Sequence, residues 1–447
     1  MKKMITLILA FALFACSDDD TTFVAPVSNN FFVTFDDSYG NEPASYVEIS
    51  LVNNEDGKTY SLVTDNQGIA TIEVVPGTYK VNASLVLSAE AYEVFTGQPV
   101  TTDISFNASL EELKITSETL GNTELVLVTG KLGDLLIKQV YYSGSDVKLG
   151  ALYRDQFFEI YNNSNEDIYL DGLYFAQVYG ASSISSNLKD YHLPNGQYDW
   201  SQSLYQNYED TANTDFIYAD EVLQFPGSGE DYLLEARKSV IVAATAVNHK
   251  SPLTVIDDSG EEVTYSVPEP QRTIDLSQAP FEAYYRPYQE AQGSSYLDSD
   301  IDNPNSVNME IAFKTFSGKD LILDPLGRDA FVIFKAEAET FAQWDALPLP
   351  SITADNYSET TNTYLQIPVD VIIDGVETQR NDPSKAKPKR LTDAIDGGEI
   401  ATILGSYSSE SVIRKISKEI NGVIFYQDTN NSTNDFEVLA HPQVEIE

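Results

Sequence analysis

The segments KLGDLLIKQVYYSGS at residues 131–145 and YRDQFFEIYNNSNEDIYLDGLYF at residues 153–175 decide the fold. They contain three runs of apolar, β-branched and aromatic residues, at residues 135–142, 156–161 and 168–174. Ser-Gly-Ser ends the first run, Asn-Asn-Ser ends the second, and Asp-Gly interrupts the third. Short runs of this kind between turn-forming residues are typical of half-buried antiparallel strands. The sequence therefore predicts an all-β fold.

The same stretch resembles the opening of lamin-tail domains, which are immunoglobulin-like β-sandwiches. The residues that carry this resemblance are Ile137, Val140, Phe158, Glu159, Ile160, Asn162, Leu170 and Gly172. Residues near the C-terminus resemble the close of such a domain, namely Ser411, Arg414, Asp428, Asn430, Asn431, Ser432, Asp435 and Phe436. The resemblance implies one lamin-tail-like sandwich over residues 130–447, with long insertions at about 177–231, 248–308 and 353–364. Insertions of this length usually carry function or pack as subdomains.

Residues 31–118 predict a separate, smaller β domain. The segment TDNQGIATIEVVPGTYKV at residues 64–81 alternates apolar residues with turns at Gly68 and Pro76-Gly77. This pattern resembles the transthyretin-like, carboxypeptidase-regulatory-like β-sandwiches. In that family such modules are spacers, docking units and sometimes glycan binders. The resemblance implies that this domain is a stalk.

Residues 1–15 are predicted to be a secretory signal peptide. A basic start, an apolar core and a small residue precede Cys16, and the apolar core is too short to span a bilayer. The sequence Leu-Phe-Ala-Cys at residues 13–16 resembles the bacterial lipobox, which implies that Cys16 carries lipid. Because Cys16 is the only cysteine, the mature chain would have no disulfide and no cysteine nucleophile.

Residues 16–30 are predicted to be an acidic tether that follows the lipidated cysteine. Asp18, Asp19 and Asp20 resemble the surface-export signal of Bacteroidota lipoproteins, although a simple solvated tether is the alternative. The whole chain resembles a Bacteroidota lipoprotein family, domain of unknown function 4876. That family implies an outer-membrane, cell-surface location and no established activity.

The formal net charge of −42 excludes one class of partner. A surface this acidic repels phosphate backbones, so we expect no nucleic-acid binding. Attraction for cationic ligands is one consequence of such a charge, but solubility at a crowded cell surface is the interpretation that we favour.

Enzymatic chemistry is not indicated by the sequence. His192, His249 and His441 are scattered without metal-ligand spacing, and no Gly-x-Ser-x-Gly elbow is present to aim a nucleophile. We therefore expect a non-enzymatic protein without a cofactor.

One acidic loop is a candidate calcium site. Asp298, Asp300 and Asp302 alternate along the chain, so their carboxylates could turn toward one hard cation such as Ca²⁺. Asn303 and Met309 depart from the calcium-loop pattern, which calls for Gly and Glu at those positions. A solvated acidic loop is the interpretation that we favour.

The first insertion is rich in aromatic residues set among Asn, Gln and Ser. This composition suits recognition of a glycan, peptide or protein ligand, because Tyr and Trp offer stiff contact area and amides offer adaptable hydrogen bonds. The alternative is that these rings cover the sandwich. The candidate ligand-binding residues, including a second cluster, are Tyr191, Tyr198, Trp200, Tyr205, Tyr208, Tyr284 and Tyr285.

A single basic cluster occurs in the acidic chain, at Lys385, Lys387, Lys389 and Arg390. We expect these side chains to pair with local carboxylates, and contact with an acidic partner is the alternative.

Taken together, the sequence predicts a surface-exposed outer-membrane lipoprotein that binds a ligand. By analogy with its family, it would be an accessory to a TonB-dependent nutrient transporter. The alternative is a structural or adhesive cell-surface protein.

Overall fold

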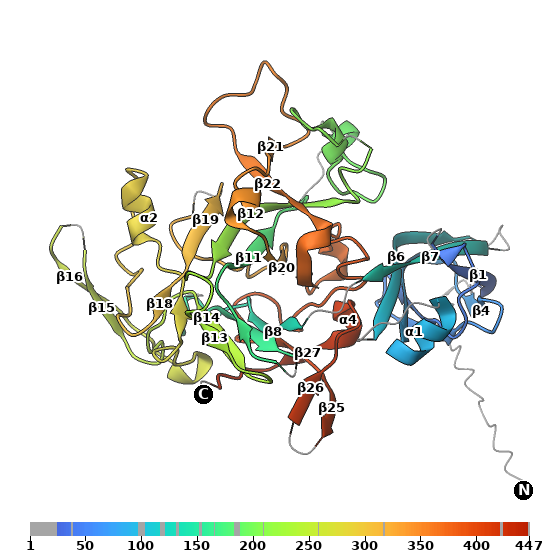
Figure 1. Ribbon diagram of the computed structural model, residues 1–447, viewed down its shortest axis with the longest axis horizontal. Coiled ribbons are helices and arrows are strands. Elements are labelled where there is room, and N and C mark those ends of the chain that lie inside the picture. Colours follow the sequence, from blue (N-terminus) through green and yellow to red (C-terminus); the bar gives the residue numbers. More distant parts are fainter. Residues whose placement is uncertain are drawn as a thin grey trace, which may run out of the picture.

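The computed structural model describes residues 25–445, with short gaps at residues 37–38, 97–102, 117–120, 131–133, 152–153, 165, 183–187, 209, 258, 316–317 and 421–422. Strands dominate the structure, so the predicted all-β fold class is confirmed (Figure 1). The signal sequence, Cys16 and the three aspartates at residues 18–20 lie outside the described residues. Within the described residues, no helix has both the length and the apolar character needed to cross a membrane.

The first domain is a seven-stranded sheet that curls around a single core. Its strand order is β3-β2-β5-β6-β7-β1-β4. In β1, every second residue from Phe31 to Phe35 points into the core, as the period of a strand requires. Gly68 turns the chain with a φ of +74°, and a Cβ there would lie 2.4 Å from the carbonyl oxygen of Val33. The elements are β1 (Val27–Phe35), β2 (Glu48–Asn53), β3 (Thr59–Val63), β4 (Ile69–Val74), β5 (Gly77–Leu87), α1 (Ala89–Thr96), β6 (Ile104–Ile115) and β7 (Gly121–Gly130).

The second domain is a sandwich of two seven-stranded sheets. One sheet has the order β18-β17-β14-β9-β8-β24-β27, and the other has β21-β22-β12-β11-β20-β23 with β19 paired to β12. The strands of the first of these sheets are β8 (Leu135–Tyr141), β9 (Phe157–Asn162), β14 (Ser239–Ala243), β17 (Phe281–Glu282), β18 (Val307–Asn308), β24 (Ser411–Arg414) and β27 (Phe436–Leu439). The strands of the second are β11 (Leu173–Val178), β12 (Phe216–Gln224), β19 (Glu310–Lys314), β20 (Ala330–Lys335), β21 (Ala346–Pro348), β22 (Thr363–Pro368) and β23 (Ile372–Glu377).

Strand β8 joins the two ends of this domain in one sheet. It pairs with β9 on one side and with β24 on the other, where Val140 faces Val412 in antiparallel register. The core between the two sheets is rich in large apolar side chains. Phe158 from one sheet stacks on Phe175 from the other, with ring centroids 3.7 Å apart.

Strands β8 and β9 were predicted to be half-buried, but every residue in both of them is buried. The reason is that other segments cover the outer faces of both sheets. Ile274 and Leu276 pack on Tyr141 and Phe157 from outside, and a further apolar cluster lies on the outer face of the second sheet. Polar side chains on these strands are paired, as Lys138 is with Glu159 at 2.8 Å.

The segment at residues 177–231 is not purely an insertion, because it contains β12. This nine-residue strand pairs with β11, β19 and β22. Its apolar alternation is obscured in the sequence by Asp220 and Glu221, which lie in its middle.

The remaining short elements are β10 (Ile168–Tyr169), η2 (Lys189–Tyr191), η3 (Trp200–Gln202), β13 (Leu233–Leu234), β15 (Leu253–Ile256), β16 (Glu262–Tyr265), η4 (Pro270–Arg272), α2 (Arg286–Ala291), α3 (Ala338–Phe341), η5 (Val369–Val371), η6 (Pro383–Lys385), β25 (Ile416–Ile420), β26 (Val423–Tyr426) and α4 (Ser432–Asp435).

Specific polar contacts join the two domains. Ser109 on β6 donates from its backbone N and its Oγ to Asp393, at 2.8 and 2.6 Å. Asn107 donates to the carbonyl oxygen of Thr429 at 3.0 Å, and Lys80 pairs with Glu399. Figure 1 shows the first domain beside α4 of the second domain. The first domain is therefore held directly against the sandwich, in one orientation.

Candidate functional site

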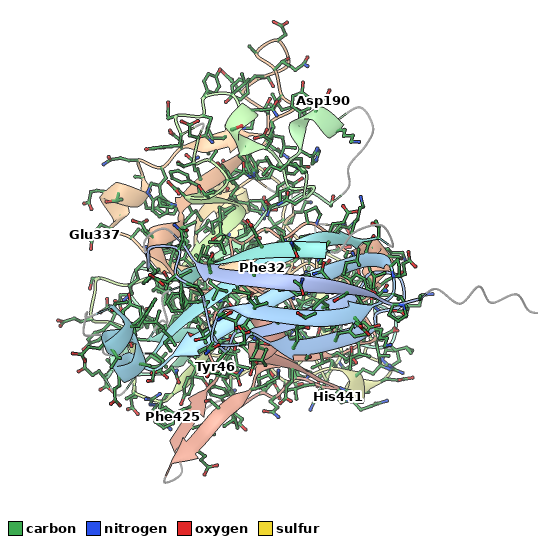
Figure 2. All side chains as sticks on the ribbon, turned by 90° about the vertical axis from the view of Figure 1, so that its right-hand side faces the viewer. Phe32, Tyr46, Asp190, Glu337, Phe425 and His441 are labelled. Atoms are coloured by element: carbon green, nitrogen blue, oxygen red, sulfur yellow. The ribbon has the colours of Figure 1, made fainter. Side chains whose placement is uncertain are left out.

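A cavity of about 480 Å³ lies between the two domains. Figure 2 shows the strands of the first domain facing the viewer, with the inserted segment around Asp190 above them. Three regions that are far apart in the sequence meet at this cavity. Its lining includes Ser109, Leu110, Glu111 and Val128 from the first domain, Tyr179, Asn195, Gln197, Tyr198, Trp200, Asn213, Thr214, Phe216 and Tyr218 from the aromatic segment, and Lys389, Arg390, Thr392 and Asp393 from the basic segment.

Stacked aromatic rings form one wall of the interdomain cavity. Trp200 lies on Tyr218 with ring centroids 3.7 Å apart and planes 9° from parallel. Tyr198 meets the edge of Trp200 at 5.8 Å and stacks on Tyr179 at 6.1 Å. Burial raises the pKa of Tyr218 to about 12, so its hydroxyl stays neutral at physiological pH. The ring faces of this wall are therefore apolar, and the hydroxyl of Tyr218 carries no charge.

Asparagine and glutamine side chains hold this wall in place. Asn213 accepts a hydrogen bond from the backbone N of Trp200 at 2.9 Å and donates one to the carbonyl oxygen of Tyr198 at 2.8 Å. Gln197 donates to the carbonyl oxygen of Lys389 at 2.6 Å and accepts from Asn195 at 2.9 Å. The amides fix the aromatic loop to the basic segment.

The basic segment lines the opposite side, and its charges are compensated. Lys389 Nζ lies 2.8 Å from Asp393 Oδ1, and Arg390 Nη2 lies 2.6 Å from Glu377 Oε1. Burial raises the pKa of Glu377 to about 7, although Arg390 opposes that shift. Lys385 also pairs with Asp382, at 2.9 Å. Lys385, Lys389 and Arg390 thus pair with local carboxylates, as expected, whereas Lys387 forms no such pair within the described part of the chain.

The structure separates the aromatic residues that the sequence grouped together. Tyr198 and Trp200 line the cavity, and Trp200 is only 5 % exposed. Tyr191 is half-buried in η2 and does not line the cavity. Tyr205 and Tyr208 lie at the surface, with 64 % and 50 % of their area exposed.

The second aromatic cluster lies away from the interdomain cavity. Tyr284 is half-buried, and Tyr285 is fully buried with its hydroxyl donating to Glu221 at 2.5 Å. Tyr285 is therefore a core residue and cannot contact a ligand at the surface.

Sequence reasoning missed Tyr179 and Tyr218, which complete the aromatic wall. Their position at and beside the apolar strands β11 and β12 was the available signal.

The acidic loop is not fully solvated, whereas a solvated loop is the interpretation that the sequence analysis favoured. Asp300 is buried and accepts hydrogen bonds from the backbone N of Tyr285 and of Arg286, at 2.9 and 3.1 Å. Asp302 is exposed and accepts from Asn308 at 2.9 Å. Asp298 is half-buried. The three carboxylates do not converge, and no group of three or more metal-ligating side chains occurs among the described residues.

Comparison with known proteins identifies the C-terminal part of the chain. No curated protein matches the sequence. A DUF4876 family protein of Bacteroides thetaiotaomicron is 23 % identical, with 92 % of this chain and 95 % of that chain covered and a TM-score of 0.49. A protein of Bacteroides ovatus proposed to be an adhesin is 10 % identical, with 68 % and 99 % covered and a TM-score of 0.19. A DUF3823 family protein of Parabacteroides merdae is also 10 % identical, with 45 % and 92 % covered and a TM-score of 0.16. Residues 237–443 match the model described as "Protein of unknown function (DUF4876)", so this part of the chain is similar to the DUF4876 family.

Proposed function

We propose that this protein is a non-enzymatic, lipid-anchored protein of the cell surface that captures a glycan in the interdomain cavity. The observation that carries the proposal is the cavity itself. Its volume of about 480 Å³ falls in the range of roughly 300–1,000 Å³ that is usual for small-molecule sites. A cavity of this size suits a small ligand.

The chemistry of the lining favours a carbohydrate over other polar ligands. Sugars present apolar C–H faces and a rim of hydroxyl groups. The rings of Tyr198 and Trp200 offer apolar contact area, and the amides of Asn195 and Gln197 lie nearby in the same lining. The charged side chains of the basic segment are already paired with carboxylates, so a neutral ligand fits the cavity better than an ionic one.

The first domain has a direct part in this proposal. Its residues Ser109, Leu110, Glu111 and Val128 form one side of the cavity, and hydrogen bonds to Asp393 fix that side against the sandwich. A transthyretin-like spacer would thus double as one wall of the binding site.

The location in this proposal rests on the N-terminal sequence. The lipobox-like sequence at Cys16 supports a lipid anchor in the outer membrane, and Asp18, Asp19 and Asp20 support export to the outer face. Delivery of the captured ligand to a TonB-dependent transporter rests on the family resemblance alone. A structural or adhesive role is the alternative, and it would not need an occupied cavity.

Binding of neutral oligosaccharides to the purified full-length protein tests the proposal. Isothermal titration calorimetry against a panel of neutral oligosaccharides should find at least one ligand. Tyr198→Ala should weaken that ligand at least tenfold, which corresponds to about 1.4 kcal/mol. Tyr205→Ala is the matched control and should leave binding unchanged, because Tyr205 is exposed and does not line the cavity.

A second variant guards against a folding artefact at Tyr198. Thr214 is an exposed residue at the cavity, so Thr214→Trp should narrow the entrance without loss of core packing. The variant should melt at the wild-type temperature and bind more weakly. Oligosaccharide binding that neither Tyr198→Ala nor Thr214→Trp affects would place the site elsewhere, and absence of binding across the panel would favour the adhesive alternative.

A further inference from the structure

A second cavity, of about 390 Å³, lies on the other side of the Tyr179-Gly180 segment from the interdomain cavity, and both cavities share those two residues. Its lining combines three aspartates and two tyrosines with apolar residues and one arginine, Arg328. The residues that matter for its chemistry are Gln177, Tyr179, Asp220, Asp324, Asp329 and Tyr407.

A β-bulge places Asp220 at this second cavity. Gln177 on β11 pairs with Glu221, while the next residue, Val178, pairs with Ala219, so Asp220 is an extra residue in β12. A bulge of this kind redirects a side chain and is frequent next to functional sites. The backbone of Asp220 is secured by a hydrogen bond of 2.9 Å from the N of Thr315 to its carbonyl oxygen.

Two buried oxygens at this cavity lack hydrogen-bond donors. Gln177 is only 4 % exposed, and its Nε2 donates to Glu221 at 2.7 Å, which fixes the direction of its amide. Its Oε1 and the Oδ1 of Asp220 have no partner within the described part of the chain. A buried acceptor without a donor destabilises the folded state, so such groups call for an explanation.

Two of the three carboxyl groups that line this cavity have no ion pair among the described residues. Asp324 makes a two-pronged pair with Arg328, at 2.8 and 2.9 Å, and Lys314 is paired with Glu221 at 2.6 Å. No ion pair reaches Asp220 or Asp329 among the described residues. Burial, and then the neighbouring Asp324, raise the pKa of Asp329 to about 7, although Arg390 and Arg328 oppose that shift. Burial and Asp329 likewise raise the pKa of Asp220.

We infer that this cavity binds a primary ammonium group, with Asp220, Asp329 and Gln177 Oε1 as its acceptors. An ammonium carries one positive charge and three N–H donors, which matches two carboxylates and one amide oxygen. The ring of Tyr407 belongs to the same lining and suits a cation, because ring faces attract positive charge. A divalent metal ion fits less well, since no three metal-ligating side chains converge among the described residues.

The ammonium can come from an amino sugar or from a lysine side chain, and the experiment separates these sources. Calorimetry on the purified full-length protein at pH 8 would use glucosamine and Nα-acetyl-lysine methylamide as probes. Their N-acetylated forms are the controls, because acetylation removes the charge and leaves the rest of each probe intact. At least one amine should bind, and its acetylated form should bind at least tenfold more weakly.

Asp220→Asn and Asp329→Asn test the acceptors with little change in shape. Each should weaken the amine at least tenfold, whereas Asp190→Asn, at an exposed carboxylate that does not line this cavity, should not. The inference is overturned if neither amine binds, if the acetylated probes bind equally well, or if both Asp→Asn variants bind as the wild type does. Binding of Ca²⁺ that Asp220→Asn abolishes, without amine binding, would also overturn it. These outcomes do not depend on oligosaccharide binding in the interdomain cavity, which Tyr198→Ala reports separately.

Discussion

Replacement of Asp300 by Asn should stabilise this protein at alkaline pH. Asp300 is only 3 % exposed, and one of its carboxyl oxygens accepts from two backbone N–H groups at the start of α2. The other oxygen has no hydrogen-bond partner within the described residues. Burial, and then the neighbouring Asp320, raise the pKa of Asp300 to about 8. The folded protein therefore prefers the protonated carboxyl.

The sign of the pH effect follows from this raised pKa. The folded state holds its proton between the unfolded pKa of about 3.9 and the folded value of about 8. The unfolded state releases its proton in that window, so the free energy of unfolding falls as the pH rises. Each pKa unit corresponds to about 1.36 kcal/mol, so the loss between pH 5 and pH 8 is at most about 4 kcal/mol. Asp320, with a pKa raised to about 7, titrates together with Asp300 and shares this loss.

Asparagine keeps an oxygen for the two backbone N–H groups and removes the ionisation. We expect the advantage of Asp300→Asn over the wild type to grow by about 2–4 kcal/mol between pH 5 and pH 8. Urea unfolding at pH 5, 6, 7 and 8 measures this difference, with Asp302→Asn as the control at an exposed carboxylate. A variant whose stability runs parallel to the wild type at every pH would show that the proton on Asp300 is not the cause.

Four further expectations follow. Trp200→Ala should cost about 3–5 kcal/mol in thermal or urea unfolding, because it removes a buried ring stacked on Tyr218; Tyr205→Ala should change stability by less than about 0.5 kcal/mol. Arg414→Met should cost about 3–5 kcal/mol, since it leaves Asp374, Asp428 and Asp435 without their shared cation; a neutral effect would mean that the three carboxyls are already protonated. Cys16→Ala should abolish labelling of the protein by a palmitate analogue in cells. Alanine at residues 18–20 should leave that label in place but protect the protein from protease added to intact cells, and equal cleavage of both forms would reduce the acidic run to a tether.

Local sequence patterns predicted the strands whose apolar residues are uninterrupted. β14 is an example, because a nearly continuous apolar run predicts burial on both faces, and Val240 to Ala243 are all buried. β12 escaped prediction since its bulge places Asp220 and Glu221 together inside the strand. A bulge is stabilised by contacts with neighbouring strands, which leave no periodic mark in the chain.

The interdomain cavity was beyond prediction for a different reason. Trp200 and Tyr198 were singled out by composition, but the cavity also needs Ser109 and Arg390. These residues are brought together by the packing of two domains, and no spacing rule connects them. The favoured interpretation of the loop at residues 298–302 as solvated was wrong for Asp300, because this carboxylate is buried against the start of α2.

The pairing of β8 with β24 has a consequence for how this chain reaches its folded state. Val140 must find Val412 before the sheet can be completed, and contacts this distant in sequence slow folding. The ribosome finishes most of the polypeptide before β24 exists, so the sandwich cannot close during synthesis. Its apolar strands meanwhile stay open to other chains, which is the usual route to aggregation. The net charge of −42 opposes this by mutual repulsion between unfinished molecules. Charge repulsion thus opposes aggregation most while β24 has not yet been synthesised.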